Sequence, residues 1–497
     1  MMTTSTKETP NLDPETAGHD TDIPDSTPAE NAPYSIFTPK QKALIVFLVS
    51  WAATFSGFSG NIYFPAIPTI ASDLSVSTEL VNITVTTYLI FQGLSPSIWG
   101  AIADVKGRRV TYICTFAVYL GACIGLAKTR HYYQLVILRC LQSAGSASTI
   151  ALGAGVVGDI TTREERGGYM GIYQMGCLVP VSVGPVIGGA LAGTLGWRSI
   201  FWFLTIFGAC FLVLLVVFLP ETLRSLVGNG SVPVRGIANS ILSVVQRRRN
   251  GGGMSVQVVN GKKARPDLLS SLKMIGEKQV SFMIIFAAIY YMVWQMIVTV
   301  MSSLFKRTYS LTEIQIGLTF IGNGVGCMLG TLLTGRFLDY DYRRLMEKHI
   351  NDRKHIKDFP LEHARLRSMW LYAGLQCAST LVFGWTIAHR VHISVPVIAT
   401  FVLGWSATSI LSTATTFMVD IFHTQSASAT AALNLARCLL GAGGIVAVLP
   451  LADVIGVGWT FTLFTGVMLI SLFLLFVQMT HGARWRLASI ERLEGDG

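Results

Sequence analysis

The chain has 497 residues, of which 51% are hydrophobic and only 13% are charged. Soluble proteins of this size carry about 25% charged residues, so the composition excludes a water-soluble globular protein. The formal net charge is +10, but the basic residues lie in short segments between apolar stretches, and we expect no nucleic-acid binding. The apolar blocks are roughly 20 residues long, the length of a helix that crosses a bilayer. The sequence therefore predicts an all-α, multi-pass membrane protein.

The chain begins with a polar segment, residues 1–40, rich in Thr, Pro, Asp and Glu. This composition is typical of disordered chain. It also lacks the apolar core of a secretory signal peptide. We expect a disordered cytosolic tail.

Twelve apolar stretches follow, six on each side of a polar central segment. They predict two six-helix bundles, 41–219 and 280–480, joined by a cytosolic linker at 220–279 and followed by a cytosolic tail at 481–497. The linker contains Asn250-Gly-Gly-Gly253 and a short amphipathic, basic helical pattern, which indicates a helix on the inner leaflet. The expected spans lie near 43–66, 80–103, 109–127, 133–157, 168–193, 198–219, 280–303, 314–338, 369–388, 395–418, 427–452 and 459–478.

An even number of spans places both termini on one side of the membrane. Of the 38 Lys and Arg residues, six lie on the other side (Lys128, Arg130, Arg198, Lys306, Arg307, Arg390) and two lie within spans (Arg139, Arg437). Basic residues gather on the cytosolic side of membrane proteins. We therefore expect cytosolic N- and C-termini.

A ten-residue phrase occurs twice, each time between apolar stretches. Gly, Asp and a pair of Arg recur at the same offsets. The copies are Gly100-Ala-Ile-Ala-Asp104-Val-Lys106-Gly107-Arg108-Arg109 and Gly335-Arg336-Phe-Leu-Asp339-Tyr-Asp341-Tyr-Arg343-Arg344. A duplicated, charged turn between spans indicates a transporter built from two related halves.

The charged positions of this phrase predict a conformational latch. Asp104 is placed to pair with Arg108 or with the N-terminus of a neighbouring helix, and Asp159 is a second partner for the arginines. Asp339 and Arg343 are the expected counterparts in the second half. Because Tyr342 stands where the first copy has Gly107, we expect the two copies to differ. The alternative is an ordinary basic turn.

Two arginines lie within spans, where a charge costs at least a few kcal/mol and needs interior partners. Arg139 is followed one turn later by Gln142 on the same face. Arg139 is a candidate ligand for an anionic substrate or for tuning a proton carrier. Arg437 is a second candidate. The alternatives are a structural role for Arg139 and a side chain of Arg437 that reaches toward the cytosol.

Ionisable acids are absent from the middle of the predicted spans, and Asp104 and Asp159 are proton-carrier candidates only by elimination. This pattern favours an anionic or neutral substrate over a cationic drug, although aromatic side chains also bind cations. The eight cysteines fall inside predicted spans, and no Cys/His cluster has metal-ligand spacing. We expect no metal, no cofactor and no enzymatic site.

Small residues and prolines mark two further segments. Gly184, Pro185, Gly188 and Gly189 in the fifth span predict a kinked helix that packs closely on its neighbours. Asn61, with Tyr63 and Pro65, predicts a broken first span that faces a central cavity.

These motifs together resemble those of the major facilitator superfamily. The phrase at 100–109, the Arg139–Gly145 stretch and the Gly184–Gly189 stretch are similar to three of its signatures, and Pro220-Glu221-Thr222 resembles the end of the sixth span in fungal 12-span drug:proton antiporters. The resemblance covers residues 36–485 and extends to the branch with quinidine-resistance pumps and citrate or itaconate exporters. The chain departs from the family pattern at Pro180, where a glycine is expected, which predicts a kink in place of a close contact.

The resemblance implies the 12-helix fold in two pseudo-symmetric halves and a secondary active exporter of the plasma membrane that exchanges protons for a small organic molecule. The expected substrate is an organic acid or a secondary metabolite, and the alternative is a hydrophobic or cationic drug. A non-transporting solute sensor is a remote alternative. We expect a monomer whose partners are substrate, protons and the lipid bilayer.

Overall fold

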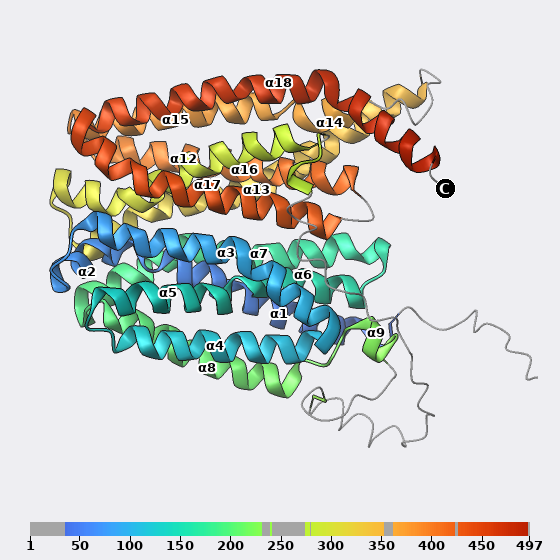
Figure 1. The fold of residues 1–497 in the computed structure, drawn as a ribbon, viewed down its shortest axis with the longest axis horizontal. Coiled ribbons are helices and arrows are strands. Elements are labelled where there is room, and N and C mark those ends of the chain that lie inside the picture. The colour runs from blue at the N-terminus through green and yellow to red at the C-terminus, as the bar shows by residue number, and fades with distance from the viewer. Residues whose placement is uncertain are drawn as a thin grey trace, which may run out of the picture.

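A computed structural model describes residues 35–230, 239–240, 274–278, 280–351, 361–422 and 426–495, and every regular element in these ranges is helical. The expected amphipathic helix of the linker and nearly all of the N-terminal tail lie outside the described residues. The long helices run side by side in two layers, blue to green below and yellow to red above (Figure 1).

The first layer contains the helices before the linker. Its elements are α1 (Pro39–Asn61), the 3-10 turn η1 (Phe64–Ala66), α2 (Ile67–Asp73), α3 (Thr78–Lys106), α4 (Arg108–Ala127), α5 (Tyr132–Ser146), α6 (Ser148–Ile160), α7 (Arg163–Leu195), α8 (Arg198–Phe218) and α9 (Arg224–Val227). The predicted break after Asn61 is confirmed, because α1 ends there and η1 follows.

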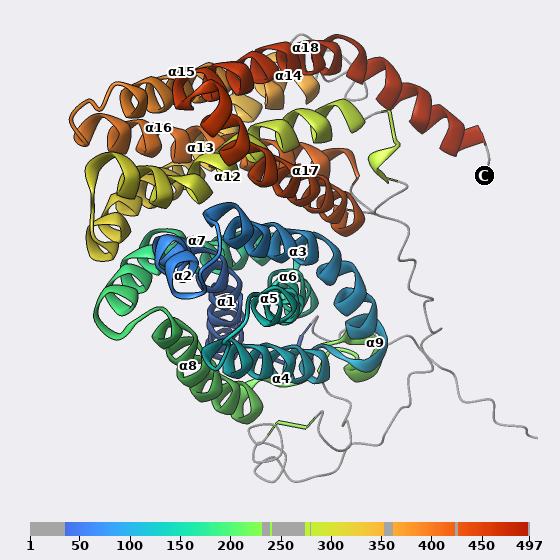
Figure 2. The same ribbon diagram turned by 60° about the vertical axis from the view of Figure 1, so that its left-hand side comes forward.

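The second layer contains the helices after the linker. Its elements are α12 (Ser281–Tyr309), α13 (Glu313–Asn351), α14 (Leu361–Leu366), α15 (Met369–Ala388), α16 (Ser394–Ile421), α17 (Ser426–Ile455) and α18 (Val457–Gly495). The two layers meet along two seams, α3 against α17 and α7 against α13 (Figure 2). We call the end of the molecule where α1 begins and α18 finishes the termini end, and the other the opposite end.

Eleven membrane-length apolar segments occur among the described residues, and α3 is the long helix that is not among them. The reason is its polar buried face: Asn82, Thr84, Thr86 and Ser95 are all less than 10% exposed. A helix that lies inside a bundle, beside α5 and α17, needs no lipid-facing apolar surface on that side. The predicted second span, 80–103, is therefore helical, but its buried face is polar.

The two copies of the repeated phrase have different backbones. Gly107 separates α3 from α4 with φ +103°, a conformation that favours glycine. Tyr342 occupies the equivalent place within α13, and the helix continues to Asn351. The predicted eighth span, 314–338, is therefore too short, because without a glycine the helix continues past its expected end.

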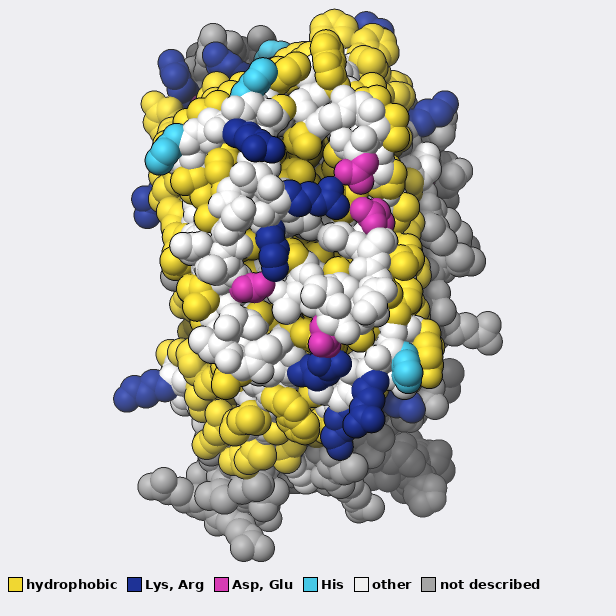
Figure 3. All heavy atoms as spheres, turned by 90° about the vertical axis from the view of Figure 1, so that its left-hand side faces the viewer, with side chains coloured by type: hydrophobic (Ala, Val, Ile, Leu, Met, Phe, Trp, Pro, Cys, Tyr) yellow, Lys and Arg dark blue, Asp and Glu magenta, His cyan; other side chains and the backbone are white. Residues whose placement is uncertain are grey.

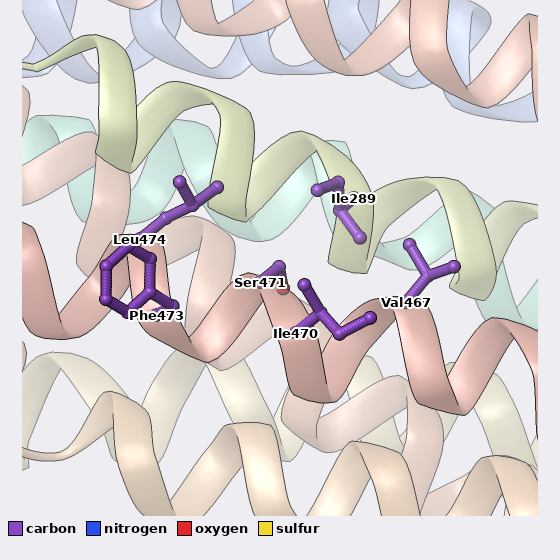
Figure 4. A pocket seen from close by; sticks show the side chains of 6 residues that line it. All are labelled: Ile289, Val467, Ile470, Ser471, Phe473 and Leu474. Carbon is purple, nitrogen blue, oxygen red and sulfur yellow. The ribbon is translucent and has the colours of Figure 1, made fainter.

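The lateral surface is apolar, as a bilayer requires. Ile470 is 76% and Phe473 66% exposed, and they border a groove of about 230 Å³ between α12 and α18 (Figure 4). All eight cysteines are free, and Cys114 and Cys210 among them are exposed. At the opposite end, charged side chains lie over the middle of the face and hydrophobic ones surround them (Figure 3).

Candidate functional site

Arg139 lies on α5, seven residues after its first residue, and is fully buried. Its Nη1 donates to the carbonyl oxygen of Ser59 at 3.0 Å and to Oε1 of Gln142 at 2.6 Å. Its guanidinium lies between two ring faces, 4.4 Å from the centroid of Tyr63 and 4.3 Å from that of Tyr88. The predicted pairing with Gln142 is confirmed.

Arg139 has no carboxylate partner among the described residues, and its Nε and Nη2 have no hydrogen-bond partner. A buried polar group without a partner costs about 1–3 kcal/mol, and more when it is charged. Ring faces and carbonyl oxygens recover part of this cost. The arrangement is a positive centre with unused donors in a low-dielectric interior, which attracts an anion.

Local chain geometry brings both rings to Arg139. Tyr63 follows the end of α1, and its hydroxyl bonds Oγ1 of Thr84 on α3 at 2.9 Å. The hydroxyl of Tyr88 donates to the carbonyl oxygen of Ser56 at 3.2 Å. The break in the first span therefore brings Tyr63 to Arg139.

Asn61 does not touch Arg139. Its Nδ2 donates to the carbonyl oxygen of Gly57 at 2.8 Å, and its Cβ would lie 3.4 Å from a Cβ added to Gly184. In this conformation Asn61 takes part in the packing of α1 on α7, and its assignment to the substrate site stays a prediction.

Arg437 lies on α17 in the second layer and is half-buried. Its Nε and Nη2 both donate to Oδ1 of Asn434, at 3.1 and 2.8 Å. The guanidinium sits 5.0 Å from the ring centroid of Tyr291. Arg437 therefore remains beside the seam with α3 rather than reaching toward the termini end.

The first copy of the repeated phrase forms a charge cluster at the termini end. Nη1 of Arg108 lies 2.9 Å from Asp104, and its Nε lies 3.1 Å from Asp159. The predicted pairing of Asp159 with the arginines is confirmed. Among the described residues the partners of Arg108 belong to the first layer, so a latch between the halves stays a prediction for another conformational state.

Glu221 is the acid of this cluster that sequence reasoning did not assign. It is 5% exposed, and its two oxygens accept from the backbone N–H groups of Arg108 and Arg109 at 2.8 and 3.1 Å. It thereby caps α4 at the helix end where a negative charge is favoured. A Cβ on Gly107 would lie 2.4 Å from Oε2 of Glu221. The Pro220-Glu221-Thr222 phrase is the sequence feature that could have indicated this role of Glu221.

The second copy builds its cluster with a different arginine. Arg365, on α14, lies 2.7 Å from Asp420 and 3.8 Å from Asp339. Its guanidinium stacks 4.3 Å from the ring centroid of Tyr342. Arg343, the expected partner, is exposed on α13. The expected pairing of Arg343 is not found because α13 continues without a break and Arg343 is exposed on it. An arginine of the next helix, Arg365, pairs with the aspartates instead.

The Gly184–Gly189 stretch packs at the opposite end of α7. A Cβ on Gly188 would lie 2.9 Å from the carbonyl carbon of Ile62, and one on Gly189 would lie 2.5 Å from the carbonyl oxygen of Glu313. Pro180 lies inside an uninterrupted α7 and packs on Gly57, whose added Cβ would be 2.8 Å away. The helices α1 and α7 therefore still approach closely at Pro180, because the glycine that allows the contact is Gly57 on α1.

One face of α13 closes the opposite end. Glu313 accepts from Thr69 at 2.7 Å, Gly317 packs on Pro185, and Phe320 stacks on Phe64 at 6.0 Å between centroids. Positions i, i+4 and i+7 share a helix face, and here each contacts the other layer. We call this set the α13 stripe.

The profile of the Major Facilitator Superfamily matches residues 49–445. This chain belongs to that superfamily. The transporter is 40% identical to citrate exporter 1 of Aspergillus niger over 94% of this chain and 91% of that protein. It is 32% identical to quinidine resistance protein 1 of Saccharomyces cerevisiae over 90% and 85%. The xylose transporter XylE of E. coli superposes with a TM-score of 0.61 at 15% identity, covering 89% and 98%.

The superfamily assignment confirms the predicted fold, with its all-helical membrane-spanning architecture. The matched citrate exporter and xylose transporter are transport proteins. Among the described residues no group of three or more His, Cys, Asp or Glu is placed to hold a metal. The side chains that bear on the substrate class are Arg139 and Arg437.

Proposed function

We propose that this transporter exports a small organic anion, a carboxylic acid such as citrate or itaconate or an acidic secondary metabolite, by proton antiport and alternating access. The observation that carries the proposal is Arg139, fully buried with two unused nitrogen donors. A carboxylate supplies both the negative charge and the acceptor oxygens that this guanidinium lacks. The 40% identity to a citrate exporter supports the same substrate class.

The site is closed in this conformation. Tyr63 and Tyr88 cover both faces of the guanidinium, and they belong to segments that border the other layer. Rocking of the two layers separates these segments from the second layer, so we propose that it opens a path for the substrate to Nε and Nη2. Arg437, beside the seam, is the second proposed anion ligand.

Export of a hydrophobic or cationic drug is the alternative, and the quinidine resistance relative supports it. A drug cation needs a free aromatic face or a buried acid. Here arginines occupy a face of Tyr63, Tyr88 and Tyr291. Trp294, which donates its Nε1 to Asn323 at 3.0 Å, is a candidate aromatic side chain for this role. The arrangement favours the anion.

We further propose a monomer in the plasma membrane with the termini end in the cytosol. In that orientation the α13 stripe closes the extracellular end, and the conformation faces the cytosol. Asp104 and Asp159 are the proposed proton-exchange groups, because both lie in the charge cluster at the termini end.

The test is uptake into inverted vesicles under an imposed proton gradient, with labelled citrate in one arm and labelled quinidine in the other. Citrate uptake that collapses with the gradient and is lost in Arg139→Gln supports the proposal. Quinidine uptake without citrate uptake would refute it and place the protein among the drug exporters.

A further inference from the structure

The seam between α3 and α17 contains a carbonyl group that its own helix does not satisfy. Pro96 lies inside α3, and a proline has no N–H to donate to the carbonyl four residues earlier. That carbonyl belongs to Gln92, near the middle of the helix. In a membrane interior such a group needs another donor.

The donor comes from the other layer. Nδ2 of Asn434, on α17, donates to the carbonyl oxygen of Gln92 at 3.2 Å. The backbones approach closely here because Gly93 has no side chain: an added Cβ would lie 3.1 Å from Cβ of Cys438 and 3.5 Å from Cα of Leu435. Asn434 therefore joins the two layers at the carbonyl that Pro96 leaves free.

The other end of the same amide holds an arginine. Oδ1 of Asn434 accepts from Nε and Nη2 of Arg437, and Tyr291 supports the guanidinium from one face. These contacts use one edge of the guanidinium. The edge formed by Nη1 and Nη2 stays available on a half-buried side chain, and it is the edge that a carboxylate binds with two parallel hydrogen bonds.

We propose that Asn434 is a positioning residue that aims Arg437 at the substrate carboxylate while its amide is anchored on the Gln92 carbonyl of the opposite layer. When the seam shifts at Gln92, Asn434 loses its anchor and Arg437 loses its orientation. The affinity for the anion then differs between the two states of the transport cycle, as coupling requires. This inference rests on the proposed function for its substrate, but not for the contact between the layers.

The contact is tested without substrate by the thermal stability of four purified proteins: wild type, Asn434→Ala, Pro96→Ala and the double variant. Asn434→Ala leaves the Gln92 carbonyl unpaired, so we expect a lower Tm. In the Pro96→Ala background the new N–H satisfies that carbonyl, and adding Asn434→Ala lowers the Tm much less. Equal losses of Tm in both backgrounds would overturn the proposed anchor.

The positioning role is tested by citrate uptake in the same set. We expect Asn434→Ala to raise the KM for citrate about tenfold, the effect of losing one charge-assisted hydrogen bond, with kcat less affected. The double variant regains Tm but keeps the raised KM, because Arg437 still lacks its acceptor. Asn434→Asp, which places a carboxylate beside Arg437, raises the KM further.

Two results separate this inference from the proposed function. A KM that rises in Arg437→Gln but is unchanged in Asn434→Ala would overturn the positioning role while leaving the anion site intact. A wild type that transports no citrate would refute the substrate class, whereas the Tm comparison would still decide whether Asn434 anchors the seam.

Discussion

At the scale of single residues, the central finding is a buried arginine held by uncharged groups. Arg139 contacts a carbonyl oxygen, an amide oxygen and two tyrosine rings. An acid in their place would neutralise the charge and leave no reason for an anion to bind. In the proposed anion site, the absence of a carboxylate partner among the described residues therefore leaves the charge of Arg139 available to the substrate.

Arg139→Lys tests whether charge alone is sufficient. Lysine keeps the charge but loses the planar face that stacks on both rings and the fork that binds carboxylates. We expect kcat/KM for citrate uptake to fall at least about tenfold, and Arg139→Gln to abolish uptake, with both proteins folded. Uptake by Arg139→Lys at the wild-type rate would show that the charge alone is sufficient and would contradict a role for the planar geometry of the guanidinium.

Glu221→Gln tests the cap of α4. One carboxylate oxygen that accepts from a backbone N–H becomes an amide that repels it, so we expect a loss of about 2 kcal/mol of stability, read as a lower Tm. The matched control is Asp453→Asn, which breaks the ion pair of a 53% exposed carboxylate with Arg307, itself 51% exposed. That pair contributes less than about 1 kcal/mol, so a larger Tm change in the control would contradict this account.

At the scale of elements, one glycine decides between a turn and a helix. Gly107 allows the positive φ that ends α3, whereas Tyr342 leaves α13 unbroken. Each half nevertheless places an arginine beside two aspartates, Arg108 from the first copy and Arg365 from α14, outside the second copy. The ion-pair geometry is therefore duplicated, while the backbone that delivers it is not.

Gly107→Ala and Gly100→Ala form a matched pair within the first copy. Alanine at 107 is strained by the positive φ and collides with Glu221, so we expect a loss of at least about 2 kcal/mol and a lower Tm. Position 100 has nothing within 4 Å of an added Cβ, and Ala there leaves the Tm unchanged or raises it. Equal Tm losses in the two variants would contradict this interpretation.

Much of the element level was predictable from sequence. Apolar length gave the spans, and the pairs Arg139–Gln142 and Arg108–Asp159 were expected from spacing and charge. Glu221 and Arg365 were missed because both lie outside the repeated phrase, and no local pattern encodes how their segments pack against it. The end of α13 was missed because a charged helix resembles a charged loop in composition.

At the scale of the whole molecule, the two layers contact each other from the end opposite the termini to the middle of the molecule. The α13 stripe forms one line of contacts, and the α3–α17 seam forms the other. Backbones touch where glycines of the two layers face each other. A Cβ added to Gly189 would lie 3.1 Å from the Cα atom of Gly317. A bulky side chain there prevents this end from closing.

Gly189→Val is therefore expected to hold the transporter open at the opposite end. The added atoms collide with the backbone of α13, which cannot move aside as a flexible side chain can. The measurement is labelling of single cysteines on each side of the stripe, with Gly374→Val, where an added Cβ meets nothing within 4 Å, as the control. Labelling from the opposite end that does not increase in Gly189→Val would contradict the assignment of this end as a gate.

The unbroken α13 also makes the two ends of the transporter mechanically dependent. Its 39 residues form a rod about 58 Å long, with the gate contacts at one tip and the Asp339 charge cluster farther along. Rotating such a rod by about 10 degrees about its gate sweeps the far tip through roughly 10 Å. Any contact that holds the far end of α13 therefore resists this rotation with a long lever arm. A small force at that end is enough to oppose opening of the α13 stripe at the opposite end.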